Sequence, residues 1–281
     1  MEADLSNIIE ITSIDNEGRG IGHLNNKTIF VDNALINEKV RFRVLKKKKN
    51  ILFARAEEIL KESTQRVSPI CSFYGVCGGC SMQHFRGSTQ LAYKQRAFEE
   101  TLQHVGKVRP ETILSPIGGP QHSYRHKARF RVKFVKKKNK VLIGFNEKKS
   151  HFLMDMNMCA VVPEKISLLL EPLKLLFNTL TIKESIPQIE YASNQERHIL
   201  VIRILEKLSN SDVQSLQLFQ ETYAIEFWTQ TKGYDTIKPL IKTMHTEIIY
   251  SNIEFGLNFF FQPTSFTQIN PFINLVLIRR A

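Results

Sequence analysis

The chain has 281 residues, of which 42% are hydrophobic, and a formal net charge of +12 at pH 7. This length allows two or three domains with real cores, and no apolar run approaches the roughly 18 residues that would span a membrane. The N-terminal residues lack the basic and apolar regions of a signal peptide, so we expect a cytoplasmic protein with no membrane partner.

The excess positive charge is confined to the first part of the chain. Residues 1–160 hold 28 Lys and Arg against 15 Asp and Glu, whereas residues 161–281 hold 11 against 12. This asymmetry favours a polyanionic partner, because each phosphate that a basic side chain neutralises releases counterions. The alternative is a solubilising surface, which usually mixes both signs. We expect RNA as the partner.

Residues 7–60 have the pattern of a small β-barrel. Short apolar runs are separated by a glycine turn around Gly18 and Gly20 and by the basic tip Lys46–Lys49. About five strands in so short a segment fit an OB-like barrel, a fold that commonly binds oligonucleotides. A lysine-rich tip alone is weak evidence for binding, since such tips are often only solvated loops.

The four cysteines have an uneven spacing. Cys71, Cys77 and Cys80 lie within ten consecutive positions, and Cys159 lies far downstream. In the cytosol thiols stay reduced, so grouped cysteines favour a metal over disulfides. We therefore predict that these four thiolates hold one metal centre. A cluster of three with a remote fourth is typical of a [4Fe–4S] cluster, but zinc and unligated thiols remain open on spacing alone.

The segment from Tyr124 to Lys138 predicts a cationic strand. Arg129, Arg131 and Lys133 alternate with the apolar residues Phe130, Val132 and Phe134. Successive side chains of a strand point to opposite faces, so one face is basic and the other apolar. Such a face suits an RNA backbone. The plain alternative is an ordinary exposed strand face.

Helices and strands alternate in the rest of the chain. The expected elements are a helix over Gln90–Val105 that stops at Gly106, a helix over Pro163–Leu180 that Pro172 kinks or breaks, a hairpin of Ile186–Tyr191 with His198–Leu205, a helix from a cap at Ser211 or Asp212 to Tyr223, and strands over Ala224–Thr229 and Thr246–Gln262. These patterns predict an α+β second half.

The stretch Cys71–His84 resembles the cluster-binding signature of the iron–sulfur branch of the RNA uracil-5-methyltransferases. The similarity continues at Glu17–Ile21, at Tyr124–Arg131 and at Phe261–Asn270, and it covers essentially the whole chain in order. It implies an α+β multi-domain protein in three parts. These are an OB-like (TRAM) barrel over 1–60, a central iron–sulfur domain over 61–255, and over 256–281 only the start of a doubly wound methyltransferase domain.

The resemblance also implies a function. Members of that family use S-adenosylmethionine to methylate C5 of a chosen uridine in 23S rRNA; a cysteine thiolate adds to C6, and a carboxylate base later removes the C5 proton. It further implies a [4Fe–4S] cluster with a structural role on Cys71, Cys77, Cys80 and Cys159. Gln268 matches a residue that contacts S-adenosylmethionine, although capping the last helix is an equal alternative.

The sequence departs from the family near its end. No glycine follows Gly256, and all four cysteines are already assigned as ligands. The family's glycine-rich loop, catalytic cysteine and general-base glutamate have no counterpart, so no catalytic residue is assigned. We expect a naturally truncated, monomeric chain that binds 23S rRNA, not DNA, with little or no methyl transfer. The rivals are a non-enzymatic RNA-binding iron–sulfur protein and a zinc-stapled RNA-binding protein.

Overall fold

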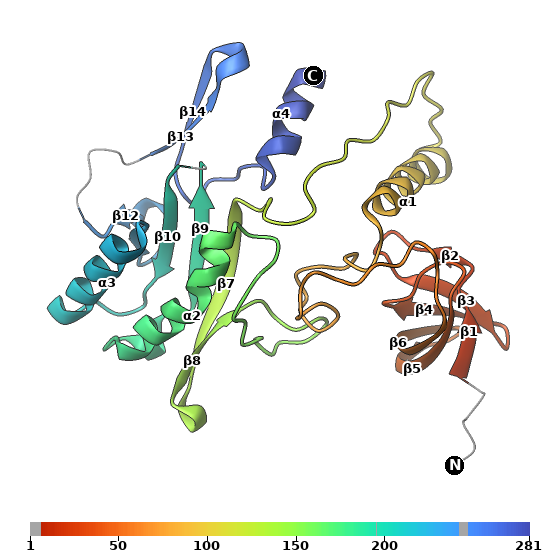
Figure 1. The fold of residues 1–281 in the computed structure, drawn as a ribbon, viewed down its shortest axis with the longest axis horizontal. Coiled ribbons are helices and arrows are strands. Elements are labelled where there is room, and N and C mark those ends of the chain that lie inside the picture. The colour runs from red at the N-terminus through yellow and green to blue at the C-terminus, as the bar shows by residue number, and fades with distance from the viewer. Residues whose placement is uncertain (1–6, 195, 242–246) are drawn as a thin grey trace. The chain divides into compact units, whose positions relative to one another are not determined.

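The computed structural model of the chain describes residues 7–194, 196–241 and 247–281. The chain divides into two compact units, one of residues 1–75 with 80–118 and the other of residues 76–79 with 119–281. Figure 1 labels the elements of both. Within the described ranges, no helix is long and apolar enough to cross a membrane.

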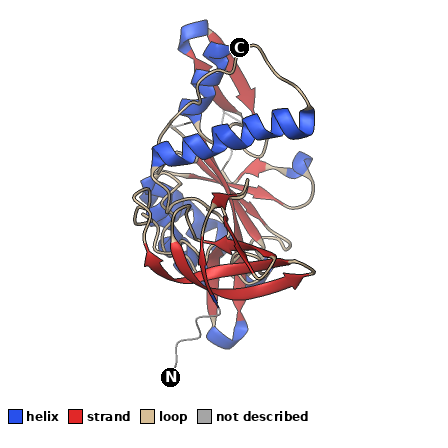
Figure 2. Cartoon of the chain, turned by 90° about the vertical axis from the view of Figure 1, so that its right-hand side faces the viewer, coloured by secondary structure: helices blue, strands red, loops and turns tan. Residues whose placement is uncertain are grey.

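The first unit is built on a β-barrel (Figure 2). Its strands are β1 (Ile8–Glu10), β2 (Ser13–Ile14), β3 (Gly20–Leu24), β4 (Lys27–Asp32), β5 (Lys39–Lys48) and β6 (Ile51–Lys61), in the sheet order β1-β5-β6-β4-β3-β2. The residues after β1 form hydrogen bonds that join the two edges of this sheet. Ile11 N–H donates to Glu38 O at 2.9 Å, and Thr12 N–H donates to Ile21 O at 2.8 Å. The predicted N-terminal barrel is therefore confirmed.

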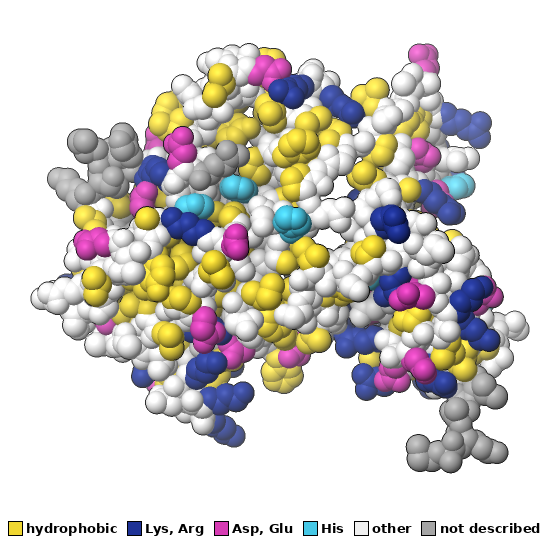
Figure 3. Space-filling view, in the orientation of Figure 1, with side chains coloured by type: hydrophobic (Ala, Val, Ile, Leu, Met, Phe, Trp, Pro, Cys, Tyr) yellow, Lys and Arg dark blue, Asp and Glu magenta, His cyan; other side chains and the backbone are white. Residues whose placement is uncertain are grey.

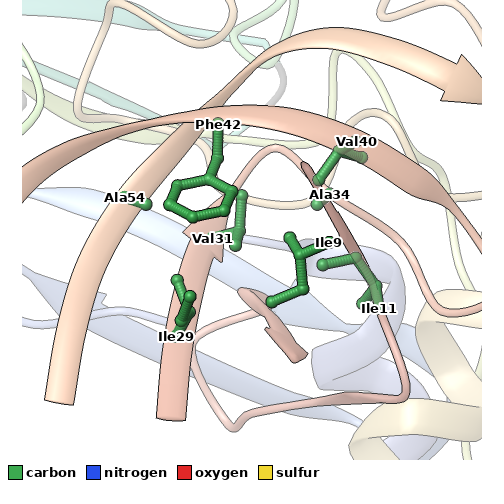
Figure 4. Packing of buried hydrophobic residues seen from close by; sticks show 8 residues of the cluster. All are labelled: Ile9, Ile11, Ile29, Val31, Ala34, Val40, Phe42 and Ala54. Atoms are coloured by element: carbon green, nitrogen blue, oxygen red, sulfur yellow. The ribbon is translucent and has the colours of Figure 1, made fainter. Parts of the chain in front are cut away.

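Alternation of side chains along the strands makes the barrel core (Figure 4). On β4, Ile29 and Val31 are fully buried, whereas Phe30 between them faces outward and stacks on Phe53 of β6 at 5.5 Å between ring centroids. The buried cluster consists of Ile9, Ile11, Ile29, Val31, Ala34, Val40, Phe42 and Ala54. Each large apolar side chain in it contributes about 1.5–3 kcal/mol by leaving water.

One helix completes the described part of the first unit. Helix α1 (Gly87–Glu100) runs on into a π-helical turn, η2 (Thr101–Gly106), and ends at Lys107, which has a left-handed φ of 54°. The predicted helix is confirmed, but its apolar face is not buried. Phe98 is 52% exposed and Val105 is 79% exposed.

The second unit is a mixed sheet in the order β12-β11-β10-β9-β7-β8, with an additional hairpin. Helix α2 packs against β8 and α3 against β11. In chain order the elements are β7 (Lys127–Val135), η3 (Lys136–Lys138), β8 (Lys140–Gly144), α2 (Glu164–Thr179), η4 (Lys183–Ser185), β9 (Gln188–Ser193), β10 (His198–Arg203), α3 (Asn210–Tyr223), β11 (Glu226–Gln230), η5 (Tyr234–Thr236), β12 (Lys238–Pro239), β13 (Ile248–Asn252), η6 (Ile253–Phe255), β14 (Leu257–Phe261) and α4 (Pro271–Arg280).

Two local predictions in this unit need correction. Pro172 lies inside α2, which runs on as one helix, so the predicted break into two short helices is wrong, whereas the predicted kink stays a prediction. Pro172 offers no N–H to the carbonyl of Leu168, a residue that is 68% exposed. Helix α3 is capped by Ser209, not by Ser211 or Asp212, since Ser209 forms a capping box with Asp212.

Two of the three parts inferred from the resemblance need correction, namely the separate iron–sulfur domain and the methyltransferase stub. Residues 61–255 form no separate iron–sulfur domain, because Cys71 and Cys80 group with the barrel unit and Cys77 and Cys159 with the second unit. Residues 256–281 do not stand apart either. Ile269 O accepts a hydrogen bond from the N–H of His126 at 2.8 Å, and a Cβ on Gly119 would lie 2.8 Å from Cδ1 of Ile273. Contacts between distant parts of the sequence therefore join both regions to the rest of their units.

Candidate nucleic-acid interface and cysteine sites

Strand β7 carries the cationic face that its sequence predicts. Ala128, Phe130 and Val132 are buried in the sheet, and Arg129, Arg131 and Lys133 are exposed. The turn η3 (Lys136–Lys138) extends the basic surface. Lys and Arg side chains gather at the tip of the β7–β8 hairpin (Figure 3). The predicted alternation is confirmed.

Arg129 is held by a buried acid. It lies directly opposite Glu190 of β9, and its Nη2 is 2.6 Å from Glu190 Oε1. Glu190 is only 3% exposed and also accepts a hydrogen bond from Gln188 Nε2 at 3.0 Å. Arg129 therefore contributes less net charge to this face than the sequence suggested. The missed signal is a single acid between Ile189 and Tyr191 in an apolar strand.

Arg131 is positioned by the loop after β8. Its Nη1 donates to Asn146 Oδ1 at 2.8 Å and to His151 O at 3.3 Å. A guanidinium has five N–H donors, so these bonds orient the group and leave donors for a phosphate. Lys133, two residues further on the same face, is exposed. Arg131 and Lys133 are therefore the best-placed residues of this strand for an RNA backbone.

Cys77 lies on a short segment that is built into the second unit. Gly78 N–H donates to Asn146 O at 2.9 Å, and Lys148 N–H donates to Val76 O at 2.7 Å. A Cβ on Gly78 would lie 3.0 Å from the same Asn146 oxygen, so glycine permits this close approach. Cys77 is 7% exposed. Cys159, the other cysteine of this unit, is 4% exposed, and its N–H donates to Ser167 Oγ at 2.9 Å.

Cys71 and Cys80 lie in the first unit, in the same segment of chain as a hydrogen-bonded Tyr–His pair. The Tyr74 hydroxyl donates to Ser81 O at 2.7 Å and hydrogen-bonds Nδ1 of His84. His84 is 1% exposed. Burial raises the pKa of Tyr74, so the phenol stays neutral. Cys71 N–H donates to Gln83 Oε1 at 3.2 Å, which fixes the start of the loop.

The four thiols were tested as a metal-binding set. As donors they suit an iron–sulfur cluster, and no disulfide joins them in the described structure. Among residues 7–194, 196–241 and 247–281, however, no three His, Cys, Asp or Glu side chains are gathered closely enough to hold a metal ion. The described side chains are therefore not gathered into a metal site, and no chemical step is assigned to a cluster.

Gln268 lies in the loop between β14 and α4. The loop is anchored to the start of β7, since Lys127 Nζ donates to Ser265 O and His126 N–H donates to Ile269 O. Gln268 itself is exposed. Asn270, not Gln268, caps α4 by accepting a hydrogen bond from Ile273 N–H at 3.1 Å. Gln268 is therefore placed where a small molecule could reach its amide.

Comparison with known proteins decides what the chain resembles. The family model described as TRAM domain matches residues 8–56, within the barrel. A protein of Cupriavidus pinatubonensis named 23S rRNA (uracil(1939)-C(5))-methyltransferase RlmD is 44% identical over 280 residues, which are 98% of this chain and 60% of that protein. RlmD of Ralstonia nicotianae is 44% identical over 279 residues, 97% of this chain and 62% of that protein. The chain is similar to RlmD.

The resemblance read from Cys71–His84 and its flanking motifs is thus confirmed. RlmD of Bordetella parapertussis is 42% identical over 274 residues, 98% of this chain and 59% of that protein. The chain therefore spans about three fifths of the length of the RlmD proteins that it matches.

The fold is also shared with a solved structure. The crystal structure of Pyrococcus abyssi tRNA (uracil-54, C5)-methyltransferase in complex with S-adenosyl-L-homocysteine matches with a TM-score of 0.68 at 17% identity, covering 98% of this chain and 64% of that chain. The match runs through almost the whole chain. It therefore contradicts the predicted separate iron–sulfur domain followed by a mere methyltransferase stub.

Proposed function

We propose that these residues belong to an enzyme that transfers a methyl group from S-adenosylmethionine to C5 of a uracil in 23S rRNA. The observation that carries the proposal is the 44% identity to RlmD over 98% of the chain. S-adenosyl-L-homocysteine, named in the matching Pyrococcus abyssi structure, is what S-adenosylmethionine becomes after it gives up its methyl group.

Within this reaction, the described residues would bind and present the RNA. The charge excess of residues 1–160, the TRAM match over residues 8–56 and the basic face of β7 all support this role. Arg131 and Lys133 would bind phosphates, whose contacts position the RNA without reading its sequence. The target uracil must leave its stack before its C5 can react, so the protein must grip the flanking backbone.

The methyl transfer itself needs a nucleophile at C6 of uracil and a base for the C5 proton. We assign neither role to a residue of this chain. Gln268 is proposed to contact S-adenosylmethionine through its exposed amide. Gln268→Ala should weaken binding of S-adenosylmethionine in isothermal titration calorimetry, whereas Gln262→Ala, an exposed glutamine earlier in the loop, should leave it unchanged.

A methyl-transfer assay tests the activity. The purified chain is incubated with unmodified 23S rRNA and S-adenosylmethionine carrying a labelled methyl group, and nucleosides are analysed for 5-methyluridine. Formation of 5-methyluridine supports the enzyme and shows that its reacting groups lie within these 281 residues. RNA binding without transfer supports only the RNA-binding role and not the activity of these residues by themselves. Failure to bind rRNA contradicts the proposal.

The RNA interface is tested by substitution. Arg131→Ala and Lys133→Ala should each weaken rRNA binding and lower the slope of log affinity against log salt by about 0.7–0.9 for each phosphate that is no longer bound. Lys232→Ala, at an exposed lysine in the β11–β12 connection, is the matched control and should leave both unchanged. Equal effects of all three substitutions would show that only overall charge matters.

We also propose Cys71, Cys77, Cys80 and Cys159 as the ligands of a [4Fe–4S] cluster. The support is the soft donor set, the burial of Cys77 and Cys159, and the glycine-permitted approach at Gly78. Protein purified without oxygen should contain about four iron atoms and show visible absorption. Cys80→Ser and Cys159→Ser should each abolish both. Zinc in place of iron, or an unchanged spectrum in either variant, contradicts the assignment.

A further inference from the structure

A row of polar side chains crosses the second unit where β7, β9 and β10 meet. His198 of β10 pairs with Ser193 of β9, and Ser193 N–H in turn donates to His126 O at 3.1 Å, just before β7. Residues directly opposite in a sheet point to the same face. His126, Ser193 and His198 therefore share one face of the sheet. Ala128, Tyr191 and Leu200 form the neighbouring row across the strands on that same face, two residues along each strand.

Tyr191 and Lys165 join this row. The Tyr191 hydroxyl lies 3.1 Å from Nδ1 of His198, and the two rings stack with centroids 6.0 Å apart. Lys165, in the first turn of α2, is exposed; its Nζ donates to Ala224 O at 2.8 Å, and its charge acts on His198. His126 acts on His198 in the same way. Histidine side chains gather on this part of the surface (Figure 3).

The acids on these elements do not neutralise the row. Glu226 lies opposite Ile199, on the other face, and its two carboxylate oxygens bind Arg197 at 2.7 and 2.8 Å. Glu190 lies on that face too, held by Arg129. Glu164 and Glu196, the nearest acids in sequence, are exposed to water. Lys127 points to the other face, where its Nζ donates to Ser265 O.

One ring nitrogen in the row has unused hydrogen-bonding capacity. Nδ1 of His126 is buried and has no hydrogen-bond partner among the described residues. A buried polar atom without a partner costs about 1–3 kcal/mol, so such an atom needs an explanation. Both histidine residues are partly exposed, so a ligand from solvent can reach their outer ring edges, and Nδ1 of His126 becomes accessible only when its ring turns.

We propose that His126, His198 and Lys165 form a phosphate-binding site for the RNA backbone. This inference rests on the proposed function, since it names where a further phosphate of the same RNA binds. The site differs from the basic face of β7, because His126 shares the opposite face with Ala128 and Phe130. It also lies beside Ile269, which accepts a hydrogen bond from His126, and hence next to Gln268.

The chemistry makes this site sensitive to pH. Burial lowers the pKa of His126; burial, followed by the charges of Lys165 and His126, lowers the pKa of His198. Both imidazoles are therefore neutral at pH 7 in the unbound protein. A bound phosphate favours the protonated imidazolium, so binding takes up protons. RNA affinity must then rise as pH falls, and by about tenfold per pH unit for each proton taken up.

RNA affinity measured against pH tests the site. A fluorescein-labelled RNA stem–loop with a uridine in its loop is titrated by fluorescence anisotropy between pH 5.5 and 8.0 at constant ionic strength. The unaltered chain should bind more tightly at pH 5.5, by about tenfold or more. The double variant His126→Asn/His198→Asn should lose this gain yet still bind at pH 8.0. His104→Asn, at an exposed histidine, should keep the gain. A double variant that keeps the full gain overturns the proposal.

Nuclear magnetic resonance of the unaltered chain gives an independent test. The imidazole resonances of His126 and His198 are followed against pH with and without inorganic phosphate. Phosphate should raise the pKa of both groups. Unmoved values for His126 and His198 overturn the phosphate site even where RNA binds. If phosphate raises the pKa of His126 and His198 but no RNA binds at any pH, the proposed function is contradicted while the phosphate site itself is supported.

Discussion

At the scale of single residues, Glu38 shows how one buried charge holds the first unit together. Glu38 is fully buried, and its carboxylate accepts hydrogen bonds from Arg66 Nε at 2.6 Å, from Arg66 Nη2 at 2.7 Å and from Leu35 N–H at 2.8 Å. Removing one partner of a buried pair leaves an uncompensated charge, which costs about 3–5 kcal/mol. We expect Arg66→Ala to lower the free energy of unfolding by that amount, measured by urea denaturation.

The barrel offers a matched control for this prediction. Arg41 Nε binds Glu58 at 3.0 Å in a pair that is partly exposed on both sides. Solvent-exposed pairs contribute about 0–1 kcal/mol, so Arg41→Ala should cost little. The loss of unfolding free energy in Arg66→Lys should lie between those of Arg66→Ala and Arg41→Ala, because an ammonium lacks the planar guanidinium that bonds both carboxylate oxygens. Equal losses in Arg66→Ala and Arg41→Ala would show that burial of Glu38 does not set the cost.

At the scale of elements, the start of α3 links stability to pH. Burial alone would raise the pKa of Asp212, but hydrogen bonds from Thr181 and Ser209 outweigh it and lower the pKa. A carboxyl whose pKa is lower in the folded state contributes stability above its unfolded pKa of about 3.9, and this contribution is lost as pH falls through the folded value. Asp212→Asn should therefore reduce stability at pH 7 and flatten its fall below about pH 4.

Urea unfolding at a series of pH values measures this effect. Asp235→Asn, at an exposed aspartate in η5, is the control and should leave the acid limb of the profile unchanged. A profile for Asp212→Asn that falls as steeply in acid as that of the unaltered chain would assign the acid sensitivity to other carboxyls.

Helix α2 makes a second prediction at this scale. Pro172 has no N–H for Leu168 O, and its ring clashes with that carbonyl. An interior proline costs about 3 kcal/mol relative to alanine in a helix. Because α2 already continues through this position, Pro172→Ala should raise the free energy of unfolding by about 1–3 kcal/mol, measured by urea denaturation. A loss of stability would show that packing of the Pro172 ring stabilises the folded chain by more than the missing helical hydrogen bond costs.

Local pattern explains which elements were predictable. Alternation gave β7 correctly, because Phe130 and Arg131 need only the two-residue period of a strand. The cap at Ser209 was missed because four consecutive residues, Ser209, Asn210, Ser211 and Asp212, are all of cap type. The carboxylate that holds Arg129 was also missed, since Glu190 lies 61 positions away and meets it only through the sheet register.

The cysteines show the same limit. Spacing identified Cys71, Cys77, Cys80 and Cys159 as a possible ligand set, but spacing does not say which thiols share a compact unit. The short segment with Cys77 joins the second unit through backbone bonds to Asn146 and Lys148, nearly seventy positions downstream. Such pairings follow from tertiary packing, which no local sequence pattern encodes.

At the scale of the whole molecule, the charge is spread over two units. The tip of the β5–β6 hairpin in the first unit carries Lys46–Lys48, and η3 in the second unit carries Lys136–Lys138. If one RNA contacts both, each cluster contributes its own counterion release. Replacing either lysine triplet by alanine should then weaken rRNA binding and lower the slope of log affinity against log salt, by about 0.7 for each phosphate that the variant no longer binds.

The two triple variants have equal charge change, so comparing them separates the two units. Affinity is measured by anisotropy from low to moderate salt, on the same rRNA fragment for both variants and the unaltered chain. Because Lys136 is already paired with Glu184 at 2.7 Å, replacing its triplet should lower the slope less than replacing that of the β5–β6 tip. A slope that changes in only one variant would confine the RNA to that unit, and the other cluster would then act only as a solvated tip.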